Sequence, residues 1–206
     1  MRQSTKQRDM TPFYGLSFRE TLLESLPGVT LAPGGLVAAL IDTPVDAMVA
    51  VADETHLHVL EFFDRKIFGR QTADVLKATR LPIDEGENRI TQQIRAELEA
   101  FFKGTRGTFQ TPLKLHGTEF IQSVWRALQQ VPAGETRSYG ALSHDIGNPK
   151  AVRAVAQANG ANRLAIILPC HRIIGADGSL TGYGGGLWRK QWLLEHEGRH
   201  FGNRLL

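Results

Sequence analysis

The hydrophobic pattern of the chain changes character about halfway along. In the first half, apolar residues gather in short runs at 37–41, 48–52 and 56–62, and turn residues such as Thr43-Pro44-Val45-Asp46 separate them. Short, mostly apolar runs bounded by turn signals are typical of strands. We therefore predict three strands that pair as an antiparallel meander.

Helical spacing follows these strands. Between 90 and 102, apolar residues recur every three or four positions, which predicts an amphipathic helix. A loop is expected over 81–88, and glycines at 104 and 107 break the chain after the helix. Residues 36–108 are thus expected to form a small α/β domain. Residues 1–35 are interpreted as an N-terminal extension with one short helix over 18–26.

Residues 112–206 are mostly helical in pattern, with helices expected over 120–128 and 187–197. Between them, Ser138 is a plausible N-cap for a helix over 139–146. Gly147-Asn148-Pro149 then reads as a tight turn, in which Asn148 caps a helix over 150–159 that ends at Gly160. Two short helices joined by a glycine-containing turn predict a helix-turn-helix over 138–160.

The second helix of this motif has two different faces. On one face the residues are apolar and are expected to pack inward: Val152, Val155 and Ala156. On the other face they are polar, basic or small: Lys150, Arg153, Ala154 and Gln157. A basic face with little bulk would let a polynucleotide approach closely, whereas a solvated helix surface would show the same pattern.

Cys170 is the only cysteine of the chain and lies in Leu168-Pro169-Cys170-His171-Arg172. It has no partner for an internal disulfide and cannot build a thiolate zinc cage, so it is either a buried packing residue or a reactive thiol. The apolar run 164–168 is expected to be a buried strand or extended segment that delivers the thiol to a loop mouth. His171, with a carboxylate such as Glu197 behind it, could activate the thiol, and we expect such neighbours to lower the pKa of Cys170.

Composition narrows the choice of compartment and partner only a little. The formal net charge of the 206 residues is +3, which permits a nucleic-acid partner without requiring one. No apolar run approaches the ~20 residues that span a bilayer, and the polar segment 1–10 lacks the core of a secretory signal. The solitary cysteine fits a reducing compartment.

Several motifs together resemble those of one family. Pro169-Cys170-His171-Arg172-Ile173-Ile174 is similar to the active-site motif of the O6-alkylguanine-DNA alkyltransferases, also called methylated-DNA-protein-cysteine methyltransferases. The likeness spans 117–198 almost without gaps, and 36–102 is a looser match to the family's N-terminal domain. Further matching segments are 134–140, 147–155, 177–183 and 192–198.

The resemblance implies an α+β fold. A small antiparallel sheet with helices, similar to ribonuclease H, would precede a mainly helical C-terminal alkyltransferase domain with the helix-turn-helix. It also implies direct DNA repair by irreversible, stoichiometric transfer of an alkyl group from O6 of guanine to Cys170 after nucleotide flipping, and it leaves open whether O4-alkylthymine is accepted. The expected partner is double-stranded DNA bound through the minor groove, by a cytoplasmic monomer (nucleoid-associated in a prokaryote) without cofactor or metal.

The resemblance also implies roles for single residues around the thiol. Cys170 would be the nucleophile, and His171 would contact a water that links the thiol to Glu197. Asn162 would be the hinge between the recognition helix and the active-site segment. Tyr139 would donate a proton or hydrogen bond to guanine N3, which makes the purine a better leaving group.

The remaining implied roles concern DNA and the flipped base. Arg153 would enter the duplex where the guanine has left, and Ala154 would let the helix approach the minor groove. Tyr183 and the backbone at Gly184 would line the guanine pocket, and Ser138 would contribute to DNA binding.

Two other functions compete with alkyl transfer. A non-enzymatic helix-turn-helix module could recognise alkylated DNA and recruit other proteins, although Cys170 argues against it. A cysteine hydrolase could use Cys170 and His171, although dyad partners usually come from separate segments.

Two departures from the family pattern put little in doubt. Asp46 stands where many members carry glycine, and the N-terminal domain lacks the cysteines through which some members bind zinc.

Overall fold

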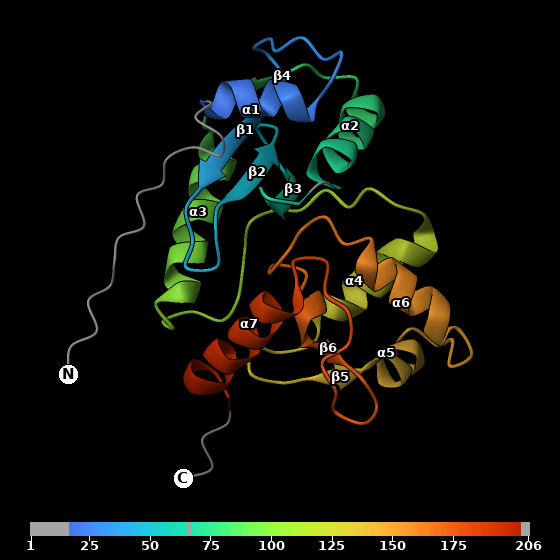
Figure 1. The fold of residues 1–206 in the computed structure, drawn as a ribbon. Coiled ribbons are helices and arrows are strands. Elements are labelled where there is room, and N and C mark those ends of the chain that lie inside the picture. The colour runs from blue at the N-terminus through green and yellow to red at the C-terminus, as the bar shows by residue number, and fades with distance from the viewer. Residues whose placement is uncertain (1–16, 66, 203–206) are drawn as a thin grey trace, which may run out of the picture.

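The structure is a computed structural model that describes residues 17–65 and 67–202. A sheet with three helices forms the first half, and a set of short helices forms the second (Figure 1). The elements of the first half, in chain order, are α1 (Phe18–Ser25), β1 (Leu36–Ile41), β2 (Met48–Ala52), β3 (Leu57–Phe62), α2 (Ile67–Thr79), β4 (Ile83–Glu85) and α3 (Arg89–Phe102).

The sheet has the strand order β3-β2-β1-β4. The antiparallel meander predicted from the sequence is confirmed, because β2 pairs antiparallel with both β1 and β3. The expectation of a loop over 81–88 is wrong in one respect, since β4 lies within it and pairs parallel with β1, Leu36 opposite Ile83. Three residues carry too little periodicity to predict a strand, and β4 exists because β1 offers it an open edge.

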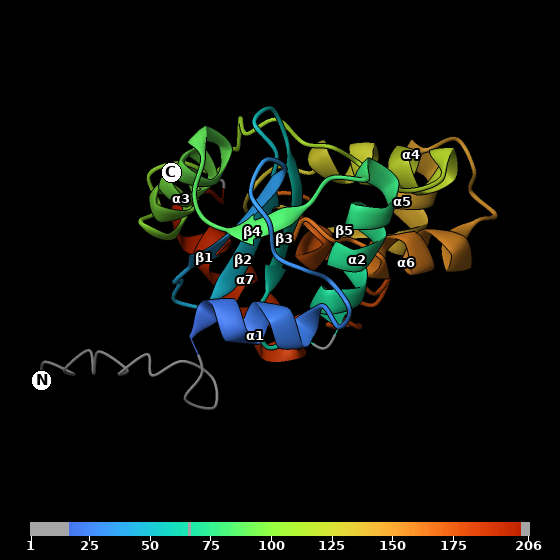
Figure 2. The same ribbon diagram turned by 90° about the horizontal axis from the view of Figure 1, so that it is seen from above.

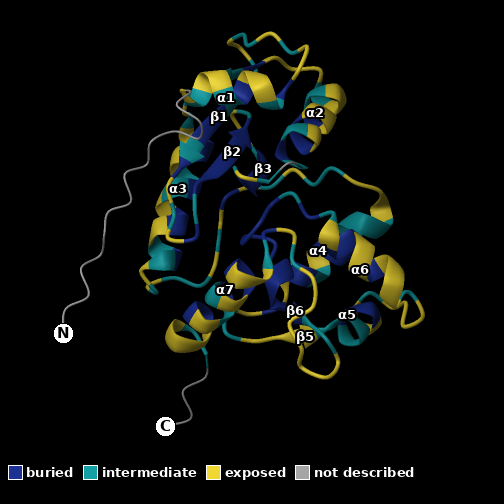
Figure 3. Cartoon of the chain, in the orientation of Figure 1, coloured by how far each residue is buried: buried dark blue, intermediate teal, exposed yellow. Residues whose placement is uncertain are grey.

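Both faces of the sheet are covered (Figures 2 and 3). On β2, Val49 and Val51 face a cluster that includes Leu22 of α1 and Phe68 of α2. The alternate residues of β2 face a second cluster with Ile94 of α3. The period-two alternation of a strand thus assigns α1 and α2 to one face and α3 to the other.

The second half consists of helices around a short pair of strands (Figure 1). The predicted helix-turn-helix is present, and Ser138 caps α5 as expected, since its Oγ accepts from the backbone N–H of Ala141 at 3.0 Å. The elements are α4 (Glu119–Gln129), β5 (Arg137–Ser138), α5 (Tyr139–Asp145), α6 (Val152–Gly160), the 3₁₀ helix η2 (Cys170–Arg172), β6 (Ile173–Ile174) and α7 (Leu187–His200).

Helix α6 begins two residues later than the sequence predicted. The backbone N–H of Ala151 donates to the carbonyl of Asn148 at 2.9 Å, which makes 148–151 a turn, and Asn148 does not cap the helix. The inward face is also different, because Val152 is 38% exposed and Ala156 is exposed as well. The residues that pack inward are Val155, Ala158 and Asn159. Contact with α4 sets this rotation, since Trp125 Nε1 donates to the carbonyl of Ala158 at 2.9 Å.

One hydrophobic cluster joins the two halves. It runs from Leu60 and Phe62 on β3 through Trp125 on α4 to Leu168 beside the cysteine and Leu193 on α7. Backbone hydrogen bonds reinforce this junction, because Leu60 donates to the carbonyl of Arg163 and accepts from Ala165. The end of β3 is therefore held directly against the segment that carries Cys170.

Candidate active site

The segment that leads to Cys170 is a series of tight turns rather than the predicted strand. Only Leu164 makes a strand-like bridge, to Leu60. The backbone N–H of Leu168 then donates to Leu164, and that of Cys170 donates to Leu168 at 2.7 Å. Ile166 has φ 72°, a left-handed conformation that is strained for a β-branched residue and costs on the order of 1–3 kcal/mol. Burial against the sheet offsets this strain, which local apolar periodicity could not reveal.

Asn162 holds these turns together. Its Oδ1 accepts from the backbone N–H of Leu164 at 2.9 Å, and its Nδ2 donates to the carbonyl of Leu168 at 2.8 Å. Nδ2 also donates to Sγ of Cys170 at 3.1 Å. The side chain lies just after α6 and is buried. It therefore connects the end of α6 to the thiol, and its role as a hinge stays a prediction.

Behind the thiol lies a buried charged cluster on η2 and α7. His171 Nε2 is 2.8 Å from Glu197 Oε1. Arg172 donates to both oxygens of the same carboxylate, through Nε at 2.9 Å and Nη2 at 2.8 Å. Glu197 also accepts from the backbone N–H of Gly134 at 3.3 Å. Of the carboxylates that could have stood behind His171, the structure selects Glu197.

Burial and pairing decide the charge of each group. Burial would raise the pKa of Glu197, but His171 and Arg172 outweigh it and lower that pKa to about 2. Burial lowers the pKa of His171, and Glu197 only partly opposes this. An ionised carboxylate only accepts hydrogen bonds, so the neutral ring carries its proton on Nε2 and presents a lone pair at Nδ1. Nδ1 has no hydrogen-bond partner among the described residues.

The prediction of a lowered thiol pKa is wrong. Burial raises the pKa of Cys170 to about 11, and the hydrogen bond from Asn162 opposes this only in part. At such a value about one thiol in ten thousand is ionised at pH 7. The physical reason is burial, which Glu61 reinforces and which Arg65 and Lys190 only partly oppose, while His171 is neutral and supplies no positive charge. The thiol is therefore stored in its protonated form.

Sγ borders a small cavity of about 20 Å³. Four residues singled out from the sequence meet there, namely Asn162, Cys170, Tyr183 and Gly184. The Tyr183 hydroxyl is buried and has no hydrogen-bond partner in the described part of the chain. The other lining residues are Arg65, Asn159, Gly160, Ala165 and Gly182.

Comparison with known proteins identifies the family of this chain. Residues 119–199 match the family profile described as 6-O-methylguanine DNA methyltransferase, DNA binding domain. A methylated-DNA–protein-cysteine methyltransferase of Methanosarcina acetivorans is 42% identical over 161 residues, which cover 78% of this chain and 97% of that protein. The chain belongs to the methylated-DNA–protein-cysteine methyltransferase family.

Solved structures support the same assignment. The crystal structure of Mycobacterium tuberculosis OGT in complex with DNA superposes with a TM-score of 0.69 and 38% sequence identity, covering 81% of this chain and 96% of that one. The similarity thus includes the N-terminal sheet as well as the segment that carries the family's cysteine motif.

Four of the residues expected to contact DNA do not line the Cys170 cavity, namely Ser138, Tyr139, Arg153 and Ala154. Arg153 and Ala154 are exposed on α6. Ser138 and Tyr139 are half-buried at the start of α5, and they are carried there by β5, which pairs with β6 immediately after the η2 turn. The short β5–β6 pair therefore couples the start of the helix-turn-helix to the cysteine segment.

Sequence reasoning missed two residues near the thiol. Arg65 lines the cavity, and Glu61 forms an ion pair with Arg65. Both come from the N-terminal half, more than a hundred positions before Cys170. One signal was available, because Glu61 is the only carboxylate in a strand that is mostly apolar, and a buried charge needs a partner.

Proposed function

We propose that this protein repairs alkylated DNA by transferring an alkyl group from O6 of guanine to Sγ of Cys170, once per molecule. The single observation that carries the proposal is the setting of Sγ. It borders a cavity and accepts a hydrogen bond from Asn162, and the next residue in the chain is a neutral His171 paired with an ionised Glu197. Membership of the methyltransferase family gives this arrangement its reaction class.

The thiol must lose its proton during the reaction because it is protonated at rest. In the proposed step, an electron pair of sulfur forms the S–C bond as the C–O6 bond breaks, and the bonding pair of the C–O6 bond stays on guanine O6. The thiol proton passes through a water to Nδ1 of His171, the ring atom with a free lone pair. The carboxylate of Glu197 stabilises the imidazolium that forms.

The leaving guanine needs to gain a proton, whereas the thiol needs to lose one. A hydrogen bond from the Tyr139 hydroxyl at guanine N3 would stabilise the developing charge, and transfer of its proton would leave the purine neutral. The immediate products are then a neutral thioether, a neutral guanine, a protonated His171 and a Tyr139 phenolate, and exchange of one proton through solvent returns both side chains to their resting forms. A thioether resists hydrolysis, which explains why each molecule would act once.

The helix-turn-helix would bind the duplex and help to flip the target base into the cavity. A target atom in a duplex is inaccessible, so the nucleotide must be flipped at a cost of a few kcal/mol. Arg153 on α6 is exposed and makes no hydrogen bond or ion pair to another described residue, so it is free to fill the vacated stack. Ala154 beside it adds no bulk, which suits approach to the minor groove by a monomer.

The test is incubation with a duplex that contains one O6-methylguanine. We expect mass spectrometry of the intact protein to show a single added methyl group on Cys170, with the reaction ending at one equivalent of DNA. A Cys170→Ser variant is the matched control and should bind the duplex without acquiring the group. Unmodified wild-type protein, or release of methanol with repeated turnover, would contradict the proposal.

The same assay separates the remaining alternatives. Binding of lesion DNA without transfer would indicate a recognition module, and turnover with a regenerated thiol would indicate a hydrolase. A parallel duplex with O4-methylthymine measures whether that base is a second substrate.

A further inference from the structure

The buried pair Glu61–Arg65 lies at the Cys170 cavity although it belongs to the N-terminal half. Glu61 is fully buried on β3, and its carboxylate accepts from the Arg65 guanidinium and from the backbone N–H of Phe62 at 2.9 Å. The Arg65 side chain is only 16% exposed. A buried ion pair adds little stability compared with apolar packing, so its position invites a functional explanation.

Arg65 packs directly on the loop that carries Tyr183. A Cβ atom added to Gly184 would overlap the Arg65 guanidinium, and one added to Gly185 would overlap the ring of Phe62. The glycines at these two positions therefore permit close contact between the loop and the end of β3. This contact places a flexible, charged side chain on one wall of the cavity.

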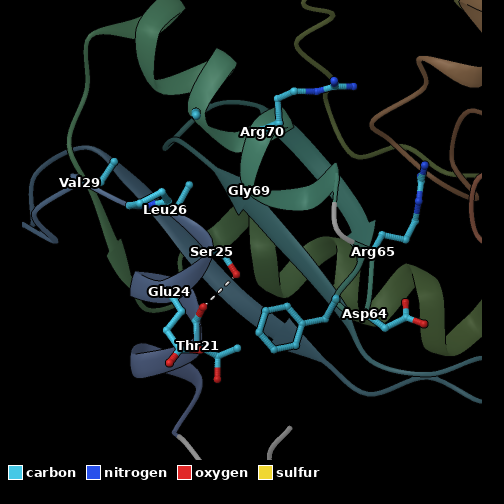
Figure 4. Close-up of a pocket in the computed structure, with 12 residues that line it drawn as sticks. Thr21, Glu24, Ser25, Leu26, Val29, Asp64, Arg65, Gly69 and Arg70 are labelled. Carbon is cyan, nitrogen blue, oxygen red and sulfur yellow. Dashed lines mark hydrogen bonds between the residues drawn. The ribbon is translucent and has the colours of Figure 1, made fainter. Parts of the chain in front are cut away.

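Arg65 borders two larger hollows as well as the cavity. It lines an open groove of about 470 Å³ that runs along Gly184, Trp188 and Arg189. It also lines a hollow of about 820 Å³ between α1 and α2, where Figure 4 shows it at the edge, away from Leu26 and Val29. No other described residue borders all three of these spaces.

We propose that Arg65, positioned by Glu61, is the gate of the acceptor cavity and determines how large an alkyl group can reach Cys170. The inference rests on the proposed alkyl transfer. A cavity of about 20 Å³ exceeds the roughly 10–15 Å³ that one water requires, and it is far too small for a purine. The wall must therefore move before a base can enter.

Arg65 is a wall residue that can move. Asn162 is held by three hydrogen bonds, and the glycines contribute only backbone, whereas Arg65 is a long side chain held at its tip by one carboxylate. If the guanidinium turns into the open groove, the cavity and the groove become one space. Burial raises the pKa of Glu61 to about 7 despite Arg65, so a carboxylate left behind can take up a proton.

The experiment compares duplexes of one sequence that contain either O6-methylguanine or O6-benzylguanine. In Arg65→Ala we expect the ratio of benzyl to methyl transfer rates to rise about tenfold, which is the usual scale for a change of steric fit in a pocket. Glu61→Gln should produce a smaller rise, because it loosens Arg65 without removing it. The double variant should match Arg65→Ala, since Glu61 acts only through Arg65.

The matched control is Arg70→Ala, because Arg70 lines the hollow between α1 and α2 but not the cysteine cavity. Its rate ratio should equal that of the wild type. A purely structural role for Arg65 would lower both rates together and leave the ratio unchanged, and that result would overturn the gate. If Arg65→Ala does not fold, Arg65→Lys replaces it and should give a smaller rise in the same ratio.

A measurement without DNA keeps this inference separate from the proposed function. The rate at which iodoacetamide modifies Cys170 should rise in Arg65→Ala and not in Arg70→Ala. If the wild type transfers methyl groups but Arg65→Ala changes neither the benzyl-to-methyl ratio nor the iodoacetamide rate, the gate alone is contradicted. If the wild type transfers nothing, the proposed function is contradicted, and the iodoacetamide rates still test the gate.

Discussion

At the scale of single residues, the site is built from groups whose properties differ from those of the free side chains. The thiol of Cys170 is harder to ionise than a free thiol, and Glu197 is easier to ionise than a free carboxyl group. The Asn162 side chain binds the backbone of Leu164 and Leu168 and the thiol of Cys170 at once. These shifts come from burial together with a few hydrogen bonds, and each can be tested by one substitution.

Asn162→Ala should lower the free energy of unfolding by about 2–4 kcal/mol, because it leaves two buried backbone groups without their partner. Urea unfolding followed by circular dichroism measures this loss. Asn159→Ala is a suitable control, since Asn159 is equally buried but its Oδ1 has no partner among the described residues. Equal losses in the two variants would argue against the hinge role of Asn162.

Glu197 should make the protein sensitive to acid. Its pKa in the folded state, about 2, lies below its ordinary value of 4.5, so its contribution to stability is present above pH 4.5 and is lost as the pH falls towards 2. Glu197→Gln should remove that dependence and lower stability at pH 7 by about 3–5 kcal/mol, because His171 and Arg172 lose their buried partner. Urea unfolding between pH 2 and pH 7 tests both statements.

Glu61 should have the opposite effect on stability. Burial raises its folded pKa to about 7, above the ordinary 4.5, so the stability it contributes is greatest below pH 4.5 and is lost as the pH rises through 7. In Glu61→Gln this fall between pH 4.5 and pH 7 should disappear, as measured by the urea midpoint at each pH. A slope that persists in the variant would assign it to another group.

At the scale of elements, α6 has separate packing and exposed faces. Val155 and Ala158 are buried against the second half's core, while Arg153 and Ala154 point to solvent. Because no described partner holds Arg153, its substitution should affect DNA and leave the fold intact.

Arg153→Ala should slow methyl transfer from duplex DNA by roughly tenfold or more, because the vacated stack is left unfilled. The thermal midpoint should stay within about a degree of the wild type, as expected for an exposed side chain. Single-turnover kinetics and a thermal scan measure the two quantities. Arg199→Ala, on the exposed side of α7, is the control for loss of one positive charge. Equal slowing in both variants would indicate a general charge effect.

At the scale of the whole molecule, the two halves are tied across the cysteine segment. Arg189 of α7 donates to the carbonyl of Val45 and forms ion pairs with Asp46 and Asp64 of the N-terminal half. Asp46 adopts φ 82°, a turn conformation that aspartate tolerates better than most residues, and its carboxylate is used in this contact.

The described residues contain no helix both long and apolar enough to cross a membrane.

The shared core predicts that the halves unfold together. All three tryptophans lie in the second half, so their fluorescence reports that half alone. Leu60→Ala on β3 should lower stability by about 2–5 kcal/mol and shift the fluorescence and circular dichroism transitions equally. A fluorescence transition that keeps its wild-type midpoint would show that the halves unfold independently.

The sequence by itself determined most elements and singled out Cys170 as the candidate nucleophile. Strand runs, helical spacing, the Ser138 cap and the motif around Cys170 are local signals, because each depends on residues a few positions apart. The inward face of α6 and the strand β4 were mispredicted for the same reason. They depend on contacts with α4 and β1 rather than on their own residues.

Only the tertiary structure decided how the thiol is held. It selected Glu197 as the partner of His171, turned the segment before Cys170 at Ile166, and brought Arg65 to the cavity from the other half of the chain. It also reversed the expected direction of the shift in the Cys170 pKa. Burial and electrostatic coupling arise from the whole packing, and no local pattern of residues encodes how deeply one sulfur atom will lie.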